Sequence, residues 1–253
     1  MSAQFPVQGL LRVLLVSPAG RRFLTTAQPE ESKQNEVFNT NRLPLIRTII
    51  ALASGTLNAE GEFQHLAPAS PTASNTPAPG SSSQVVVPAA ARTMALTVLA
   101  NLFSIPEVAA YLIEDSSVCD VTTSALSDSR EGIRAVAGSV LYNLALSIKR
   151  QQFAAGKEED EIVYPEAVSE VIVSLIEALR NETSALAANR LMDALGEFCY
   201  GIHPTCELLN AFDFPFAELY SRFAGQTSSD ATSAAETCLD LRDMAVLSGR
   251  LMQ

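Results

Sequence analysis

A repeated phrase in the middle of the sequence constrains the fold most strongly. LANL occupies Leu99–Leu102 and LYNL occupies Leu141–Leu144, so that an offset of 42 residues places Asn101 on Asn143. A third apolar helical stretch follows at Ala185–Cys199. A period of about 40–47 residues in apolar, glycine-poor sequence is typical of armadillo or HEAT arrays, whose stacked helices cover one another's apolar faces. The repeat therefore predicts an all-α, armadillo/HEAT-like array.

The composition agrees with packed helices. The 253 residues are 47% hydrophobic, contain no Trp and are rich in Ala and Leu, which favour helices over sheets. No apolar run reaches the roughly 18 residues that a membrane span needs. No basic residue precedes the apolar part of the N-terminal stretch, so no signal peptide is expected. We expect a cytoplasmic protein, with the nucleus as an additional location.

The charge argues against two classes of partner. A net charge of −11 disfavours nucleic acid and anionic membrane surfaces. The charge is uneven, because residues 1–50 carry six Lys/Arg against three Asp/Glu, a net of +3. We therefore expect an acidic ligand to bind the N-terminal part, and no nucleic acid or membrane to be bound.

Apolar periodicity and helix-end signals predict eleven or twelve helices and no convincing strand. Gly55, Pro106, Ser129 and the pair Ser228/Ser229 are the expected end signals. The segments are Phe5–Val16, Pro18–Thr26, Asn41–Ser54, Ala89–Phe103, Pro106–Ile113, Ser116–Leu126, Glu131–Arg150, Glu166–Arg180, Thr183–Cys199, Pro204–Ala211, Pro215–Phe223 and Ser229–Leu247.

One segment differs in composition from the rest. Asn58–Ser83 is rich in Pro, Ser and Thr and cannot bury enough apolar surface to offset its ordering entropy. Because similar helices resume after it, we interpret residues 58–83 as a disordered insertion within one domain that spans residues 1–253.

Four polar residues on predicted helices are candidates for binding, and each allows two interpretations. Asn101 and Asn143 could bond an extended peptide backbone, since an amide both donates and accepts, or could bond a carbonyl of an adjacent loop for stability alone. Arg190 could bind a carboxylate or phosphate in a groove, or could pair with Asp193 three residues on. Arg12 presents the same choice near the N-terminus.

The signals for catalysis are weak. Cys199, His203 and Cys206 lie close in sequence, but no acid is placed to orient the histidine and Pro204 interrupts the stretch. A structural zinc site needs four ligands, which this stretch does not supply, and there is no glycine-rich phosphate loop. We expect a protein that is not an enzyme and that has no metal or cofactor.

Four stretches in order along the chain carry a resemblance to a known family. They are FPVQGLLRVLLVSPAGRRF (Phe5–Phe23), ALTVLANLF (Ala95–Phe103), LYNLAL (Leu141–Leu146) and NRLMDALGEF (Asn189–Phe198). Together they resemble PUL domains, named for the phospholipase A2-activating protein and its relatives. The resemblance implies a right-handed superhelical array of about six helical repeats.

The resemblance also implies a function. PUL domains bind the acidic C-terminal tail of the AAA+ segregase called valosin-containing protein, in ubiquitin-dependent protein processing. By position in the motifs, Arg12 and Arg190 match the family's groove arginines, and Asn101 and Asn143 match its groove asparagines.

The high acidity of the chain and the 58–83 insertion depart from the family. Such a domain acts as a monomeric adaptor; the alternatives are a non-catalytic domain of a thioredoxin/PPPDE-type deubiquitinase or deSUMOylase, and a helical scaffold for another peptide.

Overall fold

The computed structural model describes residues 43–57, 85–158, 161–200 and 203–251. Its chain divides into two compact units, Met1–Val98 and Leu99–Gln253, which are described separately. Ten helices occur in the described residues, and the prediction of an all-α helical repeat array is confirmed. The expected helices before residue 42 and the 58–83 insertion lie outside the described residues.

In the first unit, helix α4 (Leu43–Ser54) ends at Gly55, as predicted. Gly55 has a φ of +85°. This left-handed backbone conformation closes the helix, and residues other than glycine rarely adopt it. A short antiparallel pair follows, β1 (Thr56–Leu57) with β2 (Val85–Val86), which the sequence did not predict. Each strand of this pair has two residues, so the described part of the unit remains mainly helical.

A buried arginine joins α4 to the next described helix. Arg92, on helix α5 (Ala89–Leu102), donates from Nε to the carbonyl oxygen of Ala53 at 2.8 Å. Its side chain lies against Gly55, where an added Cβ would be 3.1 Å from Cδ of Arg92. The charged group thus binds the carbonyl-rich end of α4, where the helix dipole favours a cation.

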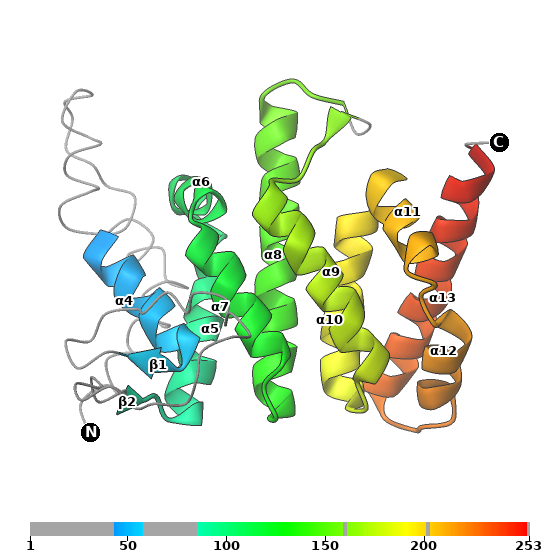
Figure 1. Cartoon of the computed structure of the whole chain (residues 1–253), viewed down its shortest axis with the longest axis horizontal. Helices are drawn as coiled ribbons and strands as arrows, with labels where there is room; N and C mark the ends of the chain where they lie inside the picture. The colour runs from blue at the N-terminus through cyan, green and yellow to red at the C-terminus, as the bar shows by residue number, and fades with distance from the viewer. Residues whose placement is uncertain (1–42, 58–84, 159–160, 201–202, 252–253) are drawn as a thin grey trace, which may run out of the picture. The chain divides into compact units, whose positions relative to one another are not determined.

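In the second unit, the described residues after the end of α5 form eight helices (Figure 1). They are α6 (Pro106–Glu114), α7 (Ser116–Leu126), α8 (Glu131–Ala154), α9 (Glu166–Asn181), α10 (Ala185–Cys199), α11 (His203–Ala211), α12 (Phe216–Ala224) and α13 (Ser229–Leu251).

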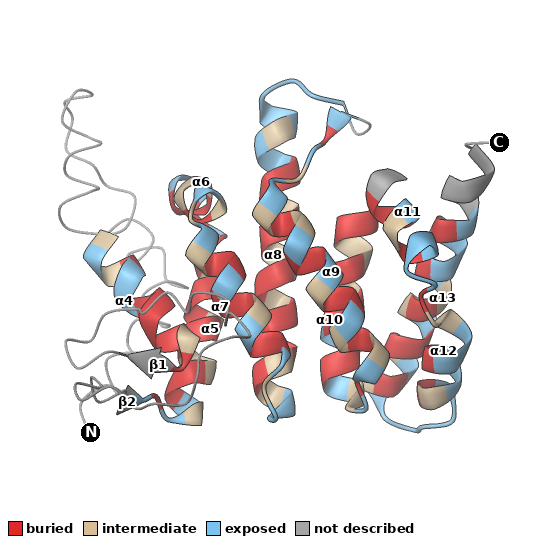
Figure 2. Ribbon diagram, in the orientation of Figure 1, coloured by how far each residue is buried: buried red, intermediate tan, exposed pale blue. Residues whose placement is uncertain are grey.

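The long helices α8, α10 and α13 lie side by side as equivalent members of successive repeats, because α10 packs against both others (Figure 1). Helices α7 and α9 pack together beside them, and α12 packs on α13. Figure 2 shows buried residues concentrated on the facing sides of these helices. The two copies of the repeated phrase meet where Nδ2 of Asn143 donates to the carbonyl oxygen of Ala100. Their leucines are all buried, namely Leu99, Leu102, Leu141 and Leu144. Burial of such a leucine contributes about 1.5–3 kcal/mol.

Helix ends follow the predicted signals in part. Pro106 stands at the start of α6, and the hydroxyl of Ser228 accepts from the N–H of Ala231 at the start of α13. The Ser129 cap was wrong: α8 begins after Arg130, whose N–H is bound by the carboxylate of Asp128. The carboxylate stands two residues before Arg130 and forms this turn instead of a serine cap.

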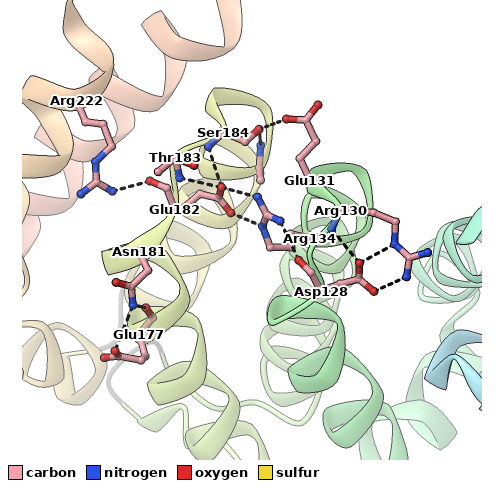
Figure 3. Close-up of polar contacts among 11 residues, drawn as sticks. Asp128, Arg130, Glu131, Arg134, Glu177, Asn181, Glu182, Thr183, Ser184 and Arg222 are labelled. Atoms are coloured by element: carbon pink, nitrogen blue, oxygen red, sulfur yellow. Dashed lines mark hydrogen bonds and ion pairs between the residues drawn. The ribbon is translucent and has the colours of Figure 1, made fainter.

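An ion pair joins two successive repeats (Figure 3). Arg134 on α8 donates from Nε and Nη2 to the two carboxylate oxygens of Glu182, at 2.7 and 2.8 Å. The same carboxylate accepts the backbone N–H groups of Thr183 and Ser184, which open the turn before α10. Arg222 on α12 donates to the backbone carbonyl of Glu182, so that one junction links elements of three repeats.

Among the described residues, no single helix is both long and apolar enough to cross a membrane. The bent pair α5 and α6, at 114°, meets the length and composition test only when its two helices are taken together.

Candidate functional site

A surface hollow of about 450 Å³ lies between α8 and α10. Its lining residues are Ser139, Tyr142 and Asn143 from α8, and Arg190 and Asp193 from α10. The α8 residues lie three and four positions apart and therefore on one face of the helix. The structure thus brings together Asn143 and Arg190, two of the four residues that the sequence singled out.

The guanidinium of Arg190 is accessible in this hollow. Its side chain is 52% exposed, and Nη1 lies 3.8 Å from Oδ2 of Asp193. An exposed pair at this length contributes little, typically less than 1 kcal/mol. The intrahelical pair expected from the sequence is therefore present, but it leaves Arg190 able to exchange Asp193 for another carboxylate.

Asp193 is the less exposed member of that pair. Its partial burial raises the pKa of the carboxyl above its ordinary value, and the positive charge of Arg190 opposes this shift. A carboxylate that is partly desolvated and loosely paired is costly to keep charged. The hollow therefore contains one accessible cation and one poorly solvated anion.

Asn143 uses only part of its bonding capacity. Its Nδ2 donates to the carbonyl oxygen of Ala100 at 3.0 Å, a stabilising bond to helix α5, where the sequence left open a bond to a carbonyl of an adjacent loop. An amide has a second N–H and a carbonyl oxygen. Neither makes a hydrogen bond to another described residue, so both remain able to bind a peptide backbone.

The other two predicted residues are not brought into this hollow by the described structure. Asn101 lies near the end of α5, is half-buried and is not among the lining residues. Its side chain makes no hydrogen bond within the described part of the chain. Arg12 lies outside the described residues.

Gly138 sets the spacing of the two helices at this point. A Cβ added to it would lie 2.7 Å from the backbone oxygen of Arg190 and 2.8 Å from its carbonyl carbon. Only glycine permits an approach this close. The backbone that carries Arg190 is therefore held directly against α8, five residues before Asn143.

Sequence reasoning missed two of the lining residues, Tyr142 and Ser139. Tyr142 stands inside the repeated phrase beside Asn143, and the residue is 38% exposed on an otherwise packed helix. The four-residue spacing from Ser139 to Asn143 could have indicated a shared face. An exposed aromatic ring offers a flat apolar surface with a polar tip to a bound partner.

The cysteine candidates do not form a reactive centre in the described residues. Cys199 and Cys206 are buried, and Sγ of Cys206 donates to the carbonyl oxygen of Cys199 at 3.4 Å. For Cys199, the hydrogen bond with Cys206 and burial raise the pKa of the thiol well above its ordinary value. The thiolate is the nucleophilic form, so this shift disfavours attack by Cys199. The same hydrogen bond lowers the pKa of Cys206, but that thiol is buried. The His203 side chain lies outside the described residues, and the described ones contain no cluster of three or more metal-ligating side chains.

These features define a class of protein, namely a helical repeat array with an open polar hollow and no assembled catalytic group among its described residues. The family comparison agrees with that class. The model of the PUL domain matches residues 2–215, most of the chain. The chain therefore belongs to the PUL domain family, a family of helical protein-interaction domains. In the other two comparisons, no curated protein and no solved structure matches it significantly.

Proposed function

We propose that this protein is a non-catalytic adaptor that binds the acidic C-terminal tail of an AAA+ ATPase of the valosin-containing protein type. The observation that carries the proposal is the meeting of Asn143 and Arg190 in one open hollow. A guanidinium binds carboxylates through charge-assisted hydrogen bonds, and an amide binds a peptide backbone. The adaptor would act in ubiquitin-dependent protein processing, in the cytoplasm and the nucleus.

The lining of the hollow fits the chemistry of such a tail. The acidic residues of the tail would bind Arg190, and the backbone of the tail would bond the free groups of Asn143. The tyrosine near the end of the tail would pack on Tyr142. Because the net charge of −11 repels an acidic tail at long range, binding depends on these local contacts. Screening helps, since the Debye length is about 8 Å at physiological salt.

Titration calorimetry with an acidic peptide that has a tyrosine near its C-terminus tests the proposal. Arg190→Ala should weaken binding tenfold or more, equivalent to about 1.4 kcal/mol, with helicity unchanged. Arg12→Ala should do the same. Arg242→Ala is the matched control, because Arg242 is an arginine of similar exposure on α13 that does not line the hollow.

If Arg190→Ala and Arg12→Ala both bind the peptide like the parent, the groove assignment is wrong. A pull-down from lysate with the parent and the Arg190→Ala variant tests the partner itself. The AAA+ ATPase should be retained by the parent and lost with the variant. Retention of other proteins without the ATPase would contradict this choice of partner.

A further inference from the structure

A second hollow, smaller and mostly apolar, lies between α6 and the C-terminal end of α8. Its volume is about 300 Å³. Helix α6 lines it with Pro106, Ala109, Ala110 and Ile113, positions i, i+3, i+4 and i+7 of one helix face. The two alanines leave space where larger side chains would have filled the gap between the helices. We call this hollow the α6–α8 slot.

Helix α8 lines the opposite side of the slot with a matching face. Ser147, Arg150, Gln151 and Ala154 have the same i, i+3, i+4, i+7 spacing. Arg150 and Gln151 are exposed, and within the described residues neither side chain has a hydrogen bond or an ion pair. The two carboxylates of α6, Glu107 and Glu114, are exposed and are not among the lining residues. The slot thus combines an apolar floor with one unpaired cation and one unpaired amide.

We propose that the α6–α8 slot binds an internal segment of a partner protein in which a leucine-sized apolar side chain is followed by an acidic residue. A volume of about 300 Å³ is at the lower limit of ligand pockets and fits a single anchoring side chain. Such anchors dominate the energy of protein interfaces. Arg150 then pairs with the neighbouring carboxylate.

Gln151 favours an internal segment over a free chain end. Its side chain both donates and accepts, which matches the N–H and C=O of a continuing peptide backbone. A terminal carboxylate can only accept, and it would leave the side-chain oxygen of Gln151 without a donor. The slot therefore takes an apolar–acidic pair within a chain, with the anchor between the helices and the backbone along Gln151.

This site is separate from the hollow between α8 and α10, because the two share no lining residue. The slot lies further along α8, and Ser147 follows Asn143 by one turn, about 5.4 Å. The proposal therefore does not rest on the binding of an acidic C-terminal tail. One protein could bind two segments at once, and their affinities would then reinforce each other through effective concentration.

Nuclear magnetic resonance titration of the isotopically labelled full chain tests the slot, with acetyl-GSLEG-amide as the probe. Saturable shifts should be concentrated on the methyl groups of Ala109, Ala110 and Ile113. Acetyl-GSAEG-amide, which lacks the anchor, and acetyl-GSLQG-amide, which lacks the charge, should each bind at least fivefold more weakly. Binding in the millimolar range is expected for a probe with a single anchor.

Variants of the chain separate the slot from general charge effects. Arg150→Glu should weaken binding of the GSLEG probe at least tenfold. Arg47→Glu, the same charge change at an exposed position on α4, should leave it unchanged. Ala110→Phe should abolish it by filling the slot, with helicity as the check on folding. None of these changes should alter affinity for the acidic, tyrosine-containing tail peptide by more than about twofold.

The proposal is overturned if no saturable shift occurs, if the shifts map to other residues, or if the three probes bind equally. It is also overturned if the slot resonances shift with protein concentration in the absence of probe, since a second copy of this chain would then be the occupant. A failure of Arg190→Ala to weaken tail binding would leave these outcomes unaffected.

Discussion

Arg134 and Glu182 are 48 positions apart and form a two-point ion pair whose bonds are 2.7 and 2.8 Å long. Side-chain exposure is 17% for Arg134 and 2% for Glu182. Burial by itself raises the pKa of Glu182. The Arg134 hydrogen bond and the N–H groups of Ser184 and Thr183 outweigh it, and the pKa is lower than its ordinary value. The junction of two repeats therefore depends on a charge that must remain paired.

The first prediction concerns the removal of one partner. Arg134→Met should destabilise the protein by about 3 kcal/mol, the lower end of the range for breaking a buried pair, because it leaves Glu182 charged and unpaired. The double variant Arg134→Met/Glu182→Gln should recover part of this loss. Chemical unfolding of the single and double variants measures the coupling. The pair Arg242–Asp243 is the control, because its side chains are 49% and 65% exposed, and Arg242→Met should leave the unfolding midpoint nearly unchanged.

The pH dependence of stability follows from the same pair. The pKa of Glu182 in the folded protein lies below its ordinary value of 4.5. Its contribution to the free energy of unfolding is therefore complete above about pH 4.5. It is lost as the pH falls through the lower, folded pKa. Glu182→Gln should therefore flatten the acid limb of the stability profile relative to the parent. Parallel acid limbs in the two proteins would contradict this assignment.

The second prediction concerns the contact between Gly138 and Arg190. Gly138→Ala would place a methyl group 2.7 Å from a backbone oxygen of α10, and the helices must separate. We expect a loss of about 1–3 kcal/mol, the usual cost of overpacking, and weaker binding of the tail peptide. Thermal unfolding and calorimetry measure the two effects.

Gly196 provides the matched control, because it lies on α10 and an added Cβ there would meet nothing within 4 Å. Gly196→Ala should stabilise the protein by up to about 1 kcal/mol, since alanine is the better helix former. Equal effects of the two substitutions would show that close approach is not what Gly138 provides.

Much of the fold could be predicted, because its signals are local. Apolar spacing and the proline at position 106 sufficed for α6, and both ends of the segment Ser116–Leu126 were correct. The end of α8 was not, since the helix continues four residues past Arg150. Its last turn is supported by the Gln152 amide, which accepts from the N–H of Val163 and donates to its carbonyl. That contact spans eleven residues and leaves no periodic signal.

The candidate site was predictable only in part for a similar reason. Asn143 was indicated by the repeat and Arg190 by its position among apolar residues. Their meeting depends on the distance between α8 and α10, which Gly138 sets through a contact 52 positions away in sequence. Spacing within one helix cannot indicate such a contact.

The third prediction concerns the cysteines. Cys119, Cys199, Cys206 and Cys238 are all buried, and burial, together with nearby carboxylates, raises the pKa of the Cys119 thiol to about 11. Thiolate is the form that reacts, so the raised pKa slows alkylation of Cys119, Cys199 and Cys238. The hydrogen bond with Cys199 lowers the pKa of Cys206, and burial alone protects that thiol. Alkylation of the native protein at pH 7.5 should therefore be slow at all four positions and fast after unfolding. Mass spectrometry after timed iodoacetamide treatment measures this. Rapid labelling of Cys199 or Cys206 in the folded protein would reopen the catalytic interpretation.

The last prediction tests whether Asp193 competes for Arg190. Asp193→Asn removes the carboxylate 3.8 Å from Nη1 of Arg190 and so removes both a rival acceptor and a negative charge from the hollow. Affinity for the acidic tail peptide should rise severalfold, on the order of 1 kcal/mol or less, the scale of an exposed pair. Calorimetry at low and high salt measures the gain, which should shrink as salt screens the repulsion.

Asp240→Asn supplies the control for this last prediction, because Asp240 is exposed on α13 and is not among the lining residues of the hollow. Both substitutions change the net charge by one unit, so any effect of overall charge is common to both. The additional gain with Asp193→Asn measures competition for Arg190 alone. If the two variants gain equally, Asp193 does not compete, and the peptide responds only to the overall charge of the protein.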